Sequence, residues 1–469
     1  MAATPSISYS ITVRLELPSS GSAISALTSA VEQAGGVVTA LDVSASGHDR
    51  LQIDVTCAAI DTAHSERLVE TLRALEGVTV GKVSDRTFLM HLGGTIQMES
   101  KHPIRNRDDL SLIYTPGVAR VCQAIAANPD DARRLTIKRN SVAVVTDGSA
   151  VLGLGNIGPA AALPVMEGKS ALFKRFAGID AWPICLDTQD PDAIVEIVRA
   201  LAPGFAGINL EDISAPRCFQ IEARLREILD IPVFHDDQHG TAIVVLAALK
   251  NALRVVGKRM DQVRVVMSGA GAAGTAILRV LLTAGVRHVV VADVEGIIHR
   301  GRPGLHESLR WLAEATNEAE LSGSLKDAVV DADVFIGVSA PNILTGEDVS
   351  RMADGAIVFA LANPVPEIDP AEARKYAAVV ATGRSDYPNQ INNVLAFPGV
   401  FRGLLDATAN RVDNDLLVAA ADAIASAVTD DELNANYIIP SVFHPDVHHS
   451  VATAVRHAAE RHAPGEGDA

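Results

Sequence analysis

The feature that most constrains this chain is a strand, a glycine-rich turn and a helix that follow one another directly. An apolar run at 263–268 leads into the turn and an apolar helical stretch at 275–284 follows it; the turn itself reads Gly269-Ala270-Gly271-Ala272-Ala273-Gly274. The three glycines permit a tight turn, close approach of a pyrophosphate, and close packing of helix on strand. The helix N-terminus then favours the anion. We therefore predict a doubly wound domain that binds a dinucleotide, with these six residues at its phosphates.

The nature of the dinucleotide depends on the next strand. This strand, residues 289–292, ends at Asp293, about 20 residues beyond the last glycine of the turn. A carboxylate there accepts hydrogen bonds from the ribose hydroxyls of NAD and repels the 2′-phosphate of NADP, so we favour NAD. The following loop carries His299, Arg300 and Arg302, which could hold a phosphate. NADP therefore stays open as an alternative.

The rest of the sequence divides into three blocks. Residues 1–90 alternate in the order βαββαβ, which predicts a ferredoxin-like domain. Residues 91–240 contain strands and helices that predict a second α/β domain. Residues 241–469 continue the βαβ series around the glycine turn and end in helices. The expected fold class is thus α/β, with a Rossmann-type domain, an α/β substrate and metal domain, and an amino-terminal ferredoxin-like domain.

Two acidic clusters follow successive predicted strands of the second block. Glu211 and Asp212 come after one strand, and Asp236 and Asp237 come after the next. The carboxyl ends of parallel strands face the crevice where ligands bind. Carboxylates that converge there without a basic partner would repel one another, and a divalent cation relieves this. The sequence therefore predicts a Mg²⁺ or Mn²⁺ site, with ordinary loop acids and helix N-caps as the alternative.

The histidines and the lysine near these clusters need separate consideration. His235 and His239 are four residues apart, but Gly240 and the strand context argue against a helical zinc pair, so ordinary loop hydrogen bonds are expected. Lys169 follows a glycine but lacks the first glycine of a P-loop. Flanked by an apolar helix, it could be partly desolvated, which would lower its pKa and make it a usable base; a surface lysine is the alternative.

Composition excludes several classes of protein. The 469 residues carry a net charge of −17, which disfavours nucleic acid as a partner. The amino terminus does not resemble a signal peptide, and no uninterrupted apolar run has the length of a membrane span, so we expect a cytoplasmic protein without a membrane partner. The four cysteines form no CxxC pair and are expected to be buried, reduced thiols.

Several segments together resemble malic enzyme in its compact bacterial form, over roughly residues 100–410. The resemblance rests on the following segments of this sequence, in order: Tyr114–Ala119, Leu152–Gly158, Glu167–Lys169, Leu210–Asp212, His235–Ala242, Leu361–Pro364 and Asn389–Asn393. The first 90 residues resemble an ACT domain, a regulatory module, in element order and in the loop at 17–21. A purely structural or oligomer-forming appendage is the alternative. The resemblance implies NAD-dependent oxidative decarboxylation of malate to pyruvate at a divalent-metal site, in a homodimer or larger homo-oligomer. An effector molecule would bind the amino-terminal block.

The resemblance also implies roles for individual residues. Tyr114 is similar to the general acid, Lys169 to the base that takes the malate hydroxyl proton, and Asp236 to the carboxylate beside that lysine. The implied metal ligands are Glu211, Asp212 and Asp237. Asn363 and Asn393 resemble the amides that contact cofactor and substrate, as Lys169 also does. Large eukaryotic members carry a carboxylate-binding arginine where this chain has Ala150, so another group must anchor the substrate here.

Other interpretations remain at this point. A metal-independent amino-acid dehydrogenase would share the two-domain plan, but its acidic clusters would be spectators. A ligand sensor on an inactive scaffold would not need Tyr114 and Lys169. Oxaloacetate decarboxylation is a further activity that the same residues could support. We also expect Lys169 to lower the pKa of Tyr114 by proximity.

Overall fold

The computed structural model describes residues 5–19, 21–47, 49–151 and 153–461. Leu152, in the glycine-rich segment at 152–158, lies outside the described residues. So do residues 1–4, 20 and 48 of the first predicted block and residues 462–469 of the last. The chain divides into two compact units, Met1–Met98 and Glu99–Ala469. Each unit is described by itself.

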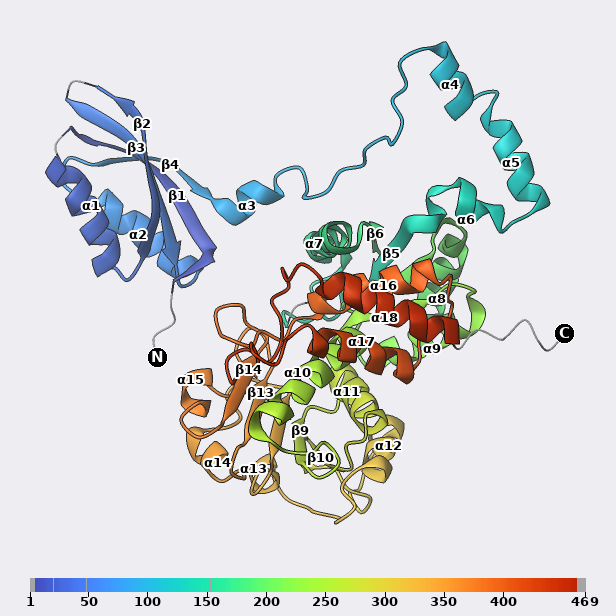
Figure 1. Ribbon diagram of the computed structural model, residues 1–469. Coiled ribbons are helices and arrows are strands. Elements are labelled where there is room, and N and C mark those ends of the chain that lie inside the picture. Colours follow the sequence, from blue (N-terminus) through green and yellow to red (C-terminus); the bar gives the residue numbers. More distant parts are fainter. Residues whose placement is uncertain (1–4, 20, 48, 152, 462–469) are drawn as a thin grey trace. The chain divides into compact units, whose positions relative to one another are not determined.

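The first unit is a four-stranded antiparallel sheet with two helices (Figure 1), in the predicted βαββαβ order. The strand order is β2-β3-β1-β4, and every neighbouring pair is antiparallel. Alternating apolar side chains of β1 and β3 face the helices, while Arg14 and Asp54 pair across the other face. The elements are β1 (Ser6–Pro18), α1 (Gly21–Gln33), β2 (Val37–Ser46), β3 (Arg50–Ala59), α2 (Thr62–Arg73), β4 (Thr79–Asp85) and α3 (Arg86–His91).

The second unit begins with short helices and a parallel sheet of order β6-β5-β7-β8. The strand order reverses between β5 and β7, the position where ligands bind in open α/β sheets. The elements of this half are α4 (Arg107–Ile113), α5 (Val118–Ala127), α6 (Asp131–Leu135), η1 (Ile137–Asn140), β5 (Ser141–Thr146), α7 (Pro159–Ala177), β6 (Asp180–Cys185), α8 (Pro191–Leu201), η2 (Ala202–Gly204), β7 (Gly207–Leu210), α9 (Arg217–Ile228) and β8 (Val233–His235).

A six-stranded sheet of order β11-β10-β9-β12-β13-β14 follows, parallel except for β11. Its order reverses between β9 and β12, directly at the glycine turn. The elements are η3 (Asp236–Gly240), α10 (Thr241–Val256), β9 (Arg264–Ser268), α11 (Ala272–Thr283), β10 (His288–Asp293), β11 (Gly296–Ile297), α12 (Glu307–Ala315), α13 (Leu325–Ala328), β12 (Val334–Gly337), α14 (Gly346–Ser350), β13 (Ile357–Ala360), α15 (Pro370–Ala373), β14 (Val379–Thr382), η4 (Asn393–Leu395), α16 (Phe397–Asp406), α17 (Asn414–Ser426) and α18 (Val447–Arg461).

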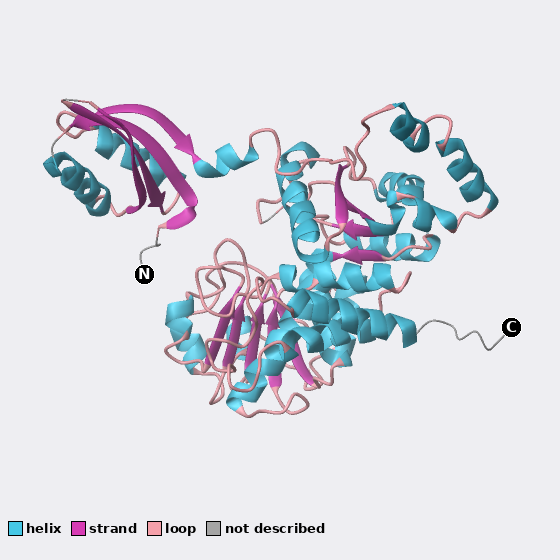
Figure 2. Cartoon of the chain, turned by 45° about the horizontal axis from the view of Figure 1, so that its top comes forward, coloured by secondary structure: helices cyan, strands magenta, loops and turns pink. Residues whose placement is uncertain are grey.

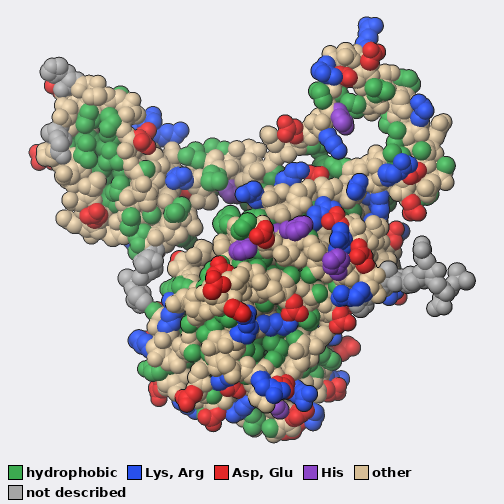
Figure 3. Space-filling view, in the orientation of Figure 1, with side chains coloured by type: hydrophobic (Ala, Val, Ile, Leu, Met, Phe, Trp, Pro, Cys, Tyr) green, Lys and Arg blue, Asp and Glu red, His purple; other side chains and the backbone are tan. Residues whose placement is uncertain are grey.

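One large apolar core joins the two sheets of this unit through the helices between them, chiefly α10, α16, α17 and α18 (Figure 2). The outer face of the smaller sheet packs on α8 and α9, and that of the larger sheet on α13 to α15. Figure 3 shows acidic and basic side chains mixed across the visible face. The predicted fold class is confirmed: a Rossmann-type domain, a second α/β domain and a ferredoxin-like domain.

Two expectations, on the cysteines and on membrane-length apolar stretches, need correction or comment. Cys57 and Cys218 are buried, but Cys185 is only half-buried and Cys122 is exposed on α5, so the prediction of four buried thiols is wrong. Among the described residues, two helical stretches, 107–127 and 236–256, are apolar and long enough for a membrane span by composition and length, which the sequence analysis did not expect. The second is 67% buried within the protein, as expected of a core helix, whereas none of the first is buried.

Candidate functional site

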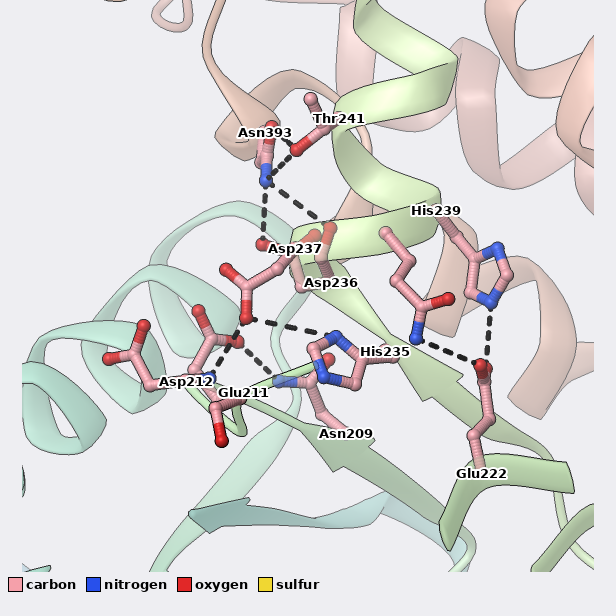
Figure 4. Close-up of polar contacts among 12 residues, drawn as sticks. Asn209, Glu211, Asp212, Glu222, His235, Asp236, Asp237, His239, Thr241 and Asn393 are labelled. Carbon is pink, nitrogen blue, oxygen red and sulfur yellow. Dashed lines mark hydrogen bonds and ion pairs between the residues drawn. The ribbon is translucent and has the colours of Figure 1, made fainter. Parts of the chain in front are cut away.

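The two acidic clusters meet at the carboxyl edge of the smaller sheet (Figure 4). Glu211 and Asp212 follow β7, and Asp237 lies in the turn after β8, the neighbouring strand. One carboxylate oxygen from each of the three lies within 4.8 Å of the others. Asp212 is held by an unusual backbone, with φ of 54°, and its N–H donates to Asp237 Oδ2 at 2.9 Å. The sheet thus gathers the three residues that the sequence suggested as metal ligands.

Lys169 lies beside this group, on the helix α7. Its Nζ is 2.6 Å from Asp236 Oδ2 and 2.8 Å from Glu211 Oε1, and its side chain is 11% exposed. The ammonium also lies over the ring of Phe397, 4.3 Å from its centroid. A surface lysine is therefore excluded. The expectation that the carboxylates lack a basic partner is wrong, because Lys169 pairs with two of them.

The predicted effect on the lysine pKa is also wrong in its net direction. Burial lowers the pKa of Lys169, as expected, but the ion pairs with Asp236 and Glu211 outweigh burial and raise the pKa above its ordinary value. Burial and the neighbouring carboxylates likewise raise the pKa of Glu211 well above normal, although Lys169 opposes them. The excess of carboxylates over cations is what a divalent cation would relieve, so the residues fit such an ion.

Asp236 and Asp237 lie in η3, a single π-helical turn that leads directly into α10. The sequence argument against a helix at this segment is therefore wrong. Gly240 closes the turn, and a Cβ at this position would overlap the Asp236 carboxylate. Only glycine leaves the space in which Asp236 reaches Lys169. π-Helical turns are rare and often occur at functional sites.

A buried network anchors this turn to the helix α9. Glu222 Oε1 is 2.7 Å from His239 Nε2 and 2.8 Å from Arg226, and Gln238 donates to Glu222 Oε2 at 3.2 Å. Although burial opposes it, the charges of His239 and Arg226 lower the pKa of Glu222 to about 2. Glu222 therefore stays ionised and holds the turn that presents Asp236 and Asp237.

The two histidines behave differently. His239 makes the hydrogen bond to Glu222, and burial lowers its pKa. Both ring nitrogens of His235 are buried without a hydrogen-bond partner among the described residues, and Nδ1 lies 3.7 Å from Asp237 Oδ2. The expectation of ordinary loop hydrogen bonds is wrong for His235.

The predicted amides lie in two places. Asn393 Nδ2 donates to Asp236 Oδ2 at 3.2 Å and to Thr241 Oγ1 at 3.1 Å. It therefore lies beside the carboxylate that pairs with Lys169. Asn363 follows β13. Its backbone carbonyl oxygen lies against Gly153, in the glycine-rich segment after β5. This contact joins the edges of the two sheets, which is where a cofactor on one sheet would reach a substrate on the other.

The dinucleotide turn has the expected geometry. Gly269 has φ of 113°, and a Cβ there would lie 2.7 Å from the Val338 carbonyl oxygen, so the turn needs glycine. α11 begins at Ala272, and the carboxyl end of β10 places Asp293 beside the turn through the bond from Gly269 N–H to Ala292 O, 2.9 Å. Of the two arginines in the following loop, Arg302 pairs with Asp293 and Arg300 with Glu320.

Tyr114 is the one predicted catalytic residue that this chain does not bring to the cluster. It ends α4, its side chain is 65% exposed, and no residue of α4 or α5 is buried. The described partners of Lys169 are Asp236, Glu211 and Phe397, so the expected proximity of Lys169 and Tyr114 is not found within the chain. Sequence reasoning also missed Asn209, which donates to Glu211 Oε2 at 2.8 Å, and Glu222. Asn209 lies in β7, two residues before Glu211, which follows the strand, and this spacing could have revealed it.

Comparisons with known proteins place this site in a family. Residues 93–226 match the model of the malic enzyme N-terminal domain, and residues 238–460 match the malic enzyme NAD-binding domain. An NAD-dependent malic enzyme of Geobacillus stearothermophilus is 56% identical over 98% of this chain and 96% of its own length. A bifunctional malic/malolactic enzyme of Bacillus subtilis is 56% identical over 78% of this chain and 90% of its own. The crystal structure of an NAD-dependent malic enzyme from Thermotoga maritima superimposes with a TM-score of 0.77 at 50% identity, covering 80% of this chain and 99% of that one.

Proposed function

Since this chain belongs to the malic enzyme family, we propose that it oxidises and decarboxylates (S)-malate to pyruvate and CO₂ while it reduces NAD, with a divalent metal ion. The observation that carries this is the position of Lys169, paired with Asp236 and Glu211, beside the three carboxylates of Glu211, Asp212 and Asp237. These residues lie at the edge of the sheet that meets the dinucleotide domain. An amino-acid dehydrogenase would not need that carboxylate group. The NAD assignment rests on Asp293 and on the relatives.

Glu211, Asp212 and Asp237 are the proposed ligands of Mg²⁺ or Mn²⁺. When bound, the cation would polarise the C2 oxygen of malate and stabilise the charge that develops on it. Asn209 orients Glu211, and the backbone of Asp212 orients Asp237. The protein thus holds the three side chains in place through hydrogen bonds of its own.

Lys169 is proposed to take the proton of the C2 hydroxyl as hydride leaves C2 for the nicotinamide, in its neutral amine form, after its ammonium has released a proton to the adjacent Asp236 carboxylate. Asp236 positions the ammonium group, and Asn393 in turn fixes Asp236. Asn393 and Asn363 are the proposed amides for substrate and cofactor, and the turn from Gly269 to Gly274, with Asp293, holds the rest of NAD. Ala150 has no side chain to grip a carboxylate, which leaves that task to these amides and Lys169.

Tyr114 is proposed to protonate C3 after CO₂ leaves, and we infer that a second copy of the chain supplies it. α4 and Tyr114, which directly follows it, expose an apolar surface made by Leu110, Leu112, Ile113 and Tyr114, and no residue of α4 or of the next helix, α5, is buried. A homodimer or larger homo-oligomer would bury this surface and complete the site. Apolar surfaces of this kind mark interaction sites.

Mixing two inactive variants tests this inference. Tyr114→Phe and Lys169→Ala chains would each lack one group, but a mixed dimer would contain one site with both groups intact. Regained malate oxidation, up to about a quarter of wild type after statistical exchange, is expected. If the mixture stays as inactive as its components while size measurements show exchanged dimers, the site is complete within one chain.

We further propose residues 1–90 as an ACT-like regulatory domain, 91–240 as the substrate and metal domain, and 241–469 as the NAD-binding domain with its carboxy-terminal helices. The first of these carries the open sheet of the first unit and would bind a small effector. A truncated chain that lacks residues 1–90 should lose any response to metabolites but keep basal turnover. The protein is proposed to be cytoplasmic, without nucleic acid or membrane partners.

The activity itself is tested by the absorbance of reduced nicotinamide with purified protein, malate and Mn²⁺. NAD should be reduced faster than NADP, and a chelator should abolish the reaction. Activity that survives the chelator would refute metal dependence. Oxaloacetate as substrate then tests decarboxylation as a second activity.

A further inference from the structure

Asp293, the residue expected to choose between NAD and NADP, is already engaged in this structure. Arg302 donates through Nη1 to Oδ1 at 2.9 Å and through Nη2 to Oδ2 at 2.6 Å. The N–H of Glu295 also donates to Oδ1, at 2.9 Å. Both oxygens of the carboxylate therefore have donors before any ribose approaches.

The pair is well sheltered. The side chain of Arg302 is 10% exposed and that of Asp293 is 16% exposed. Arg302 also contacts Glu295 Oε2 at 2.8 Å, and its Nε is buried without a partner among the described residues. The guanidinium is thus fixed beside the carboxylate, with one donor still unused.

The pair changes the usual rule for cofactor choice. An isolated carboxylate at this position repels the 2′-phosphate of NADP, whereas a carboxylate neutralised by a bidentate guanidinium repels it far less. A guanidinium fork also matches a phosphate, as it matches a carboxylate. A phosphate at the adenosine ribose could therefore draw Arg302 from Asp293.

We propose that Arg302 determines cofactor selectivity: by pairing with Asp293 it allows the 2′-phosphomonoester of NADP into a site that otherwise selects NAD. The proposal rests on the proposed function for its reaction, but not for its binding test. It makes NAD the better cofactor and NADP a usable one.

Arg300 provides a matched control in the same loop. It pairs with Glu320 at 3.1 Å, and its side chain is 52% exposed. It has the same charge and lies two residues away, but it does not contact Asp293 among the described interactions. An Arg300→Gln variant therefore removes one positive charge from the loop without releasing Asp293.

The test is fluorescence titration of NADH and NADPH into wild type, Arg302→Gln, Arg302→Lys and Arg300→Gln, without malate or metal. In Arg302→Gln the ratio of the NADPH Kd to the NADH Kd should rise at least tenfold, chiefly because NADPH binds more weakly. Arg302→Lys should give an intermediate ratio, since it keeps the charge but loses the fork, and Arg300→Gln should change the ratio less than twofold.

The same ratios in kcat/KM with malate and Mn²⁺ should follow the binding constants. An unchanged ratio in Arg302→Gln, or equal weakening of both nucleotides, would show that Arg302 only supports the loop and would overturn the proposal. A wild type that binds both nucleotides but does not oxidise malate would instead refute the proposed function. The two failures are therefore distinguishable.

Discussion

The acidic residues around Lys169 and the exposed Tyr114 take part in one proposed reaction, but they differ in burial and in the number of contacts that hold them. Glu211 and Asp236 are buried and both contact Lys169, whose side chain is 11% exposed, and a second layer of side chains holds them. Tyr114 is exposed at the end of a helix with no buried residue. The difference supports the proposal that a single chain prepares the charges for metal and substrate, while a second copy supplies the acid that ends the reaction.

The largest effect is expected from a change in the acidic cluster. Asp237→Asn removes one charged ligand from the cluster, so kcat/KM for malate should fall on the order of 1000-fold. Mn²⁺ binding, measured by calorimetry without malate, should weaken as well. Asp237 is 39% exposed, so the variant should still fold. Normal Mn²⁺ affinity in a folded Asp237→Asn protein would remove Asp237 from the metal site.

A change at the exposed Tyr114 should affect turnover but not binding. Tyr114→Phe should lower kcat about 100-fold, the usual contribution of a general acid, while NADH and Mn²⁺ affinities stay unchanged. The comparison sharpens if the two variants separate in this way, with binding lost in one and only turnover lost in the other. Full turnover in Tyr114→Phe would exclude the tyrosine as the acid.

Glu222 tests whether the second layer is needed. Glu222→Gln removes the charge shared by Arg226 and His239, so Mn²⁺ affinity should fall about tenfold as the π-helical turn loosens. The free energy of unfolding should fall by about 3 kcal/mol, as for a broken buried pair. Glu227→Gln, an exposed change on the same helix, is the control.

The pH dependence of that stability difference has a defined sign. The pKa of Glu222 is lowered from 4.5 to about 2, so its contribution is fully present above pH 4.5 and is lost as the pH falls through 2. The gap between the urea midpoints of wild type and Glu222→Gln should narrow as the pH falls from 4.5 toward 2. A gap that widened on acidification would contradict this origin.

The smallest effect concerns the thiols and tests assembly without touching the site. Burial raises the pKa of Cys57 to about 11 and that of Cys218 to about 12, so both should resist a thiol reagent in the folded protein. Cys122 on α5 is exposed and should react. If a second copy covers α5, the labelling rate of Cys122 should fall as the protein concentration rises. A rate independent of concentration, across the range where dimers form, would leave α5 outside the interface.

The sequence predicted the sheets and the residues at their edges because strand patterns and glycine spacing are local signals. The glycine turn from Gly269 to Gly274 and the acids at 211, 212 and 237 follow apolar strands, and their convergence required only that the strands be parallel. The predicted family and its activity followed from several such segments in order. These signals do not depend on how side chains meet across the fold.

The features that could not be predicted depend on contacts between side chains that are distant in the sequence. The pKa of Lys169, on α7, depends on its burial and on Asp236 and Glu211, which follow two different strands. Glu222 looked like an ordinary charged residue until the fold placed it beside His239. Arg302 was expected to hold a phosphate, and only the fold shows that it pairs with Asp293. The exposure of Tyr114 could not be predicted either, because no local pattern shows that a helix will find no partner within its own chain.

The space at Gly240 has a consequence for how this site tolerates variation. Every other amino acid would carry a Cβ into the Asp236 carboxylate and so displace the partner of Lys169. A saturation library screened for growth that depends on the enzyme should therefore recover almost no substitutions at Gly240, although the residue has no chemical group of its own. A search for essential positions that counts only charged and polar residues would overlook it.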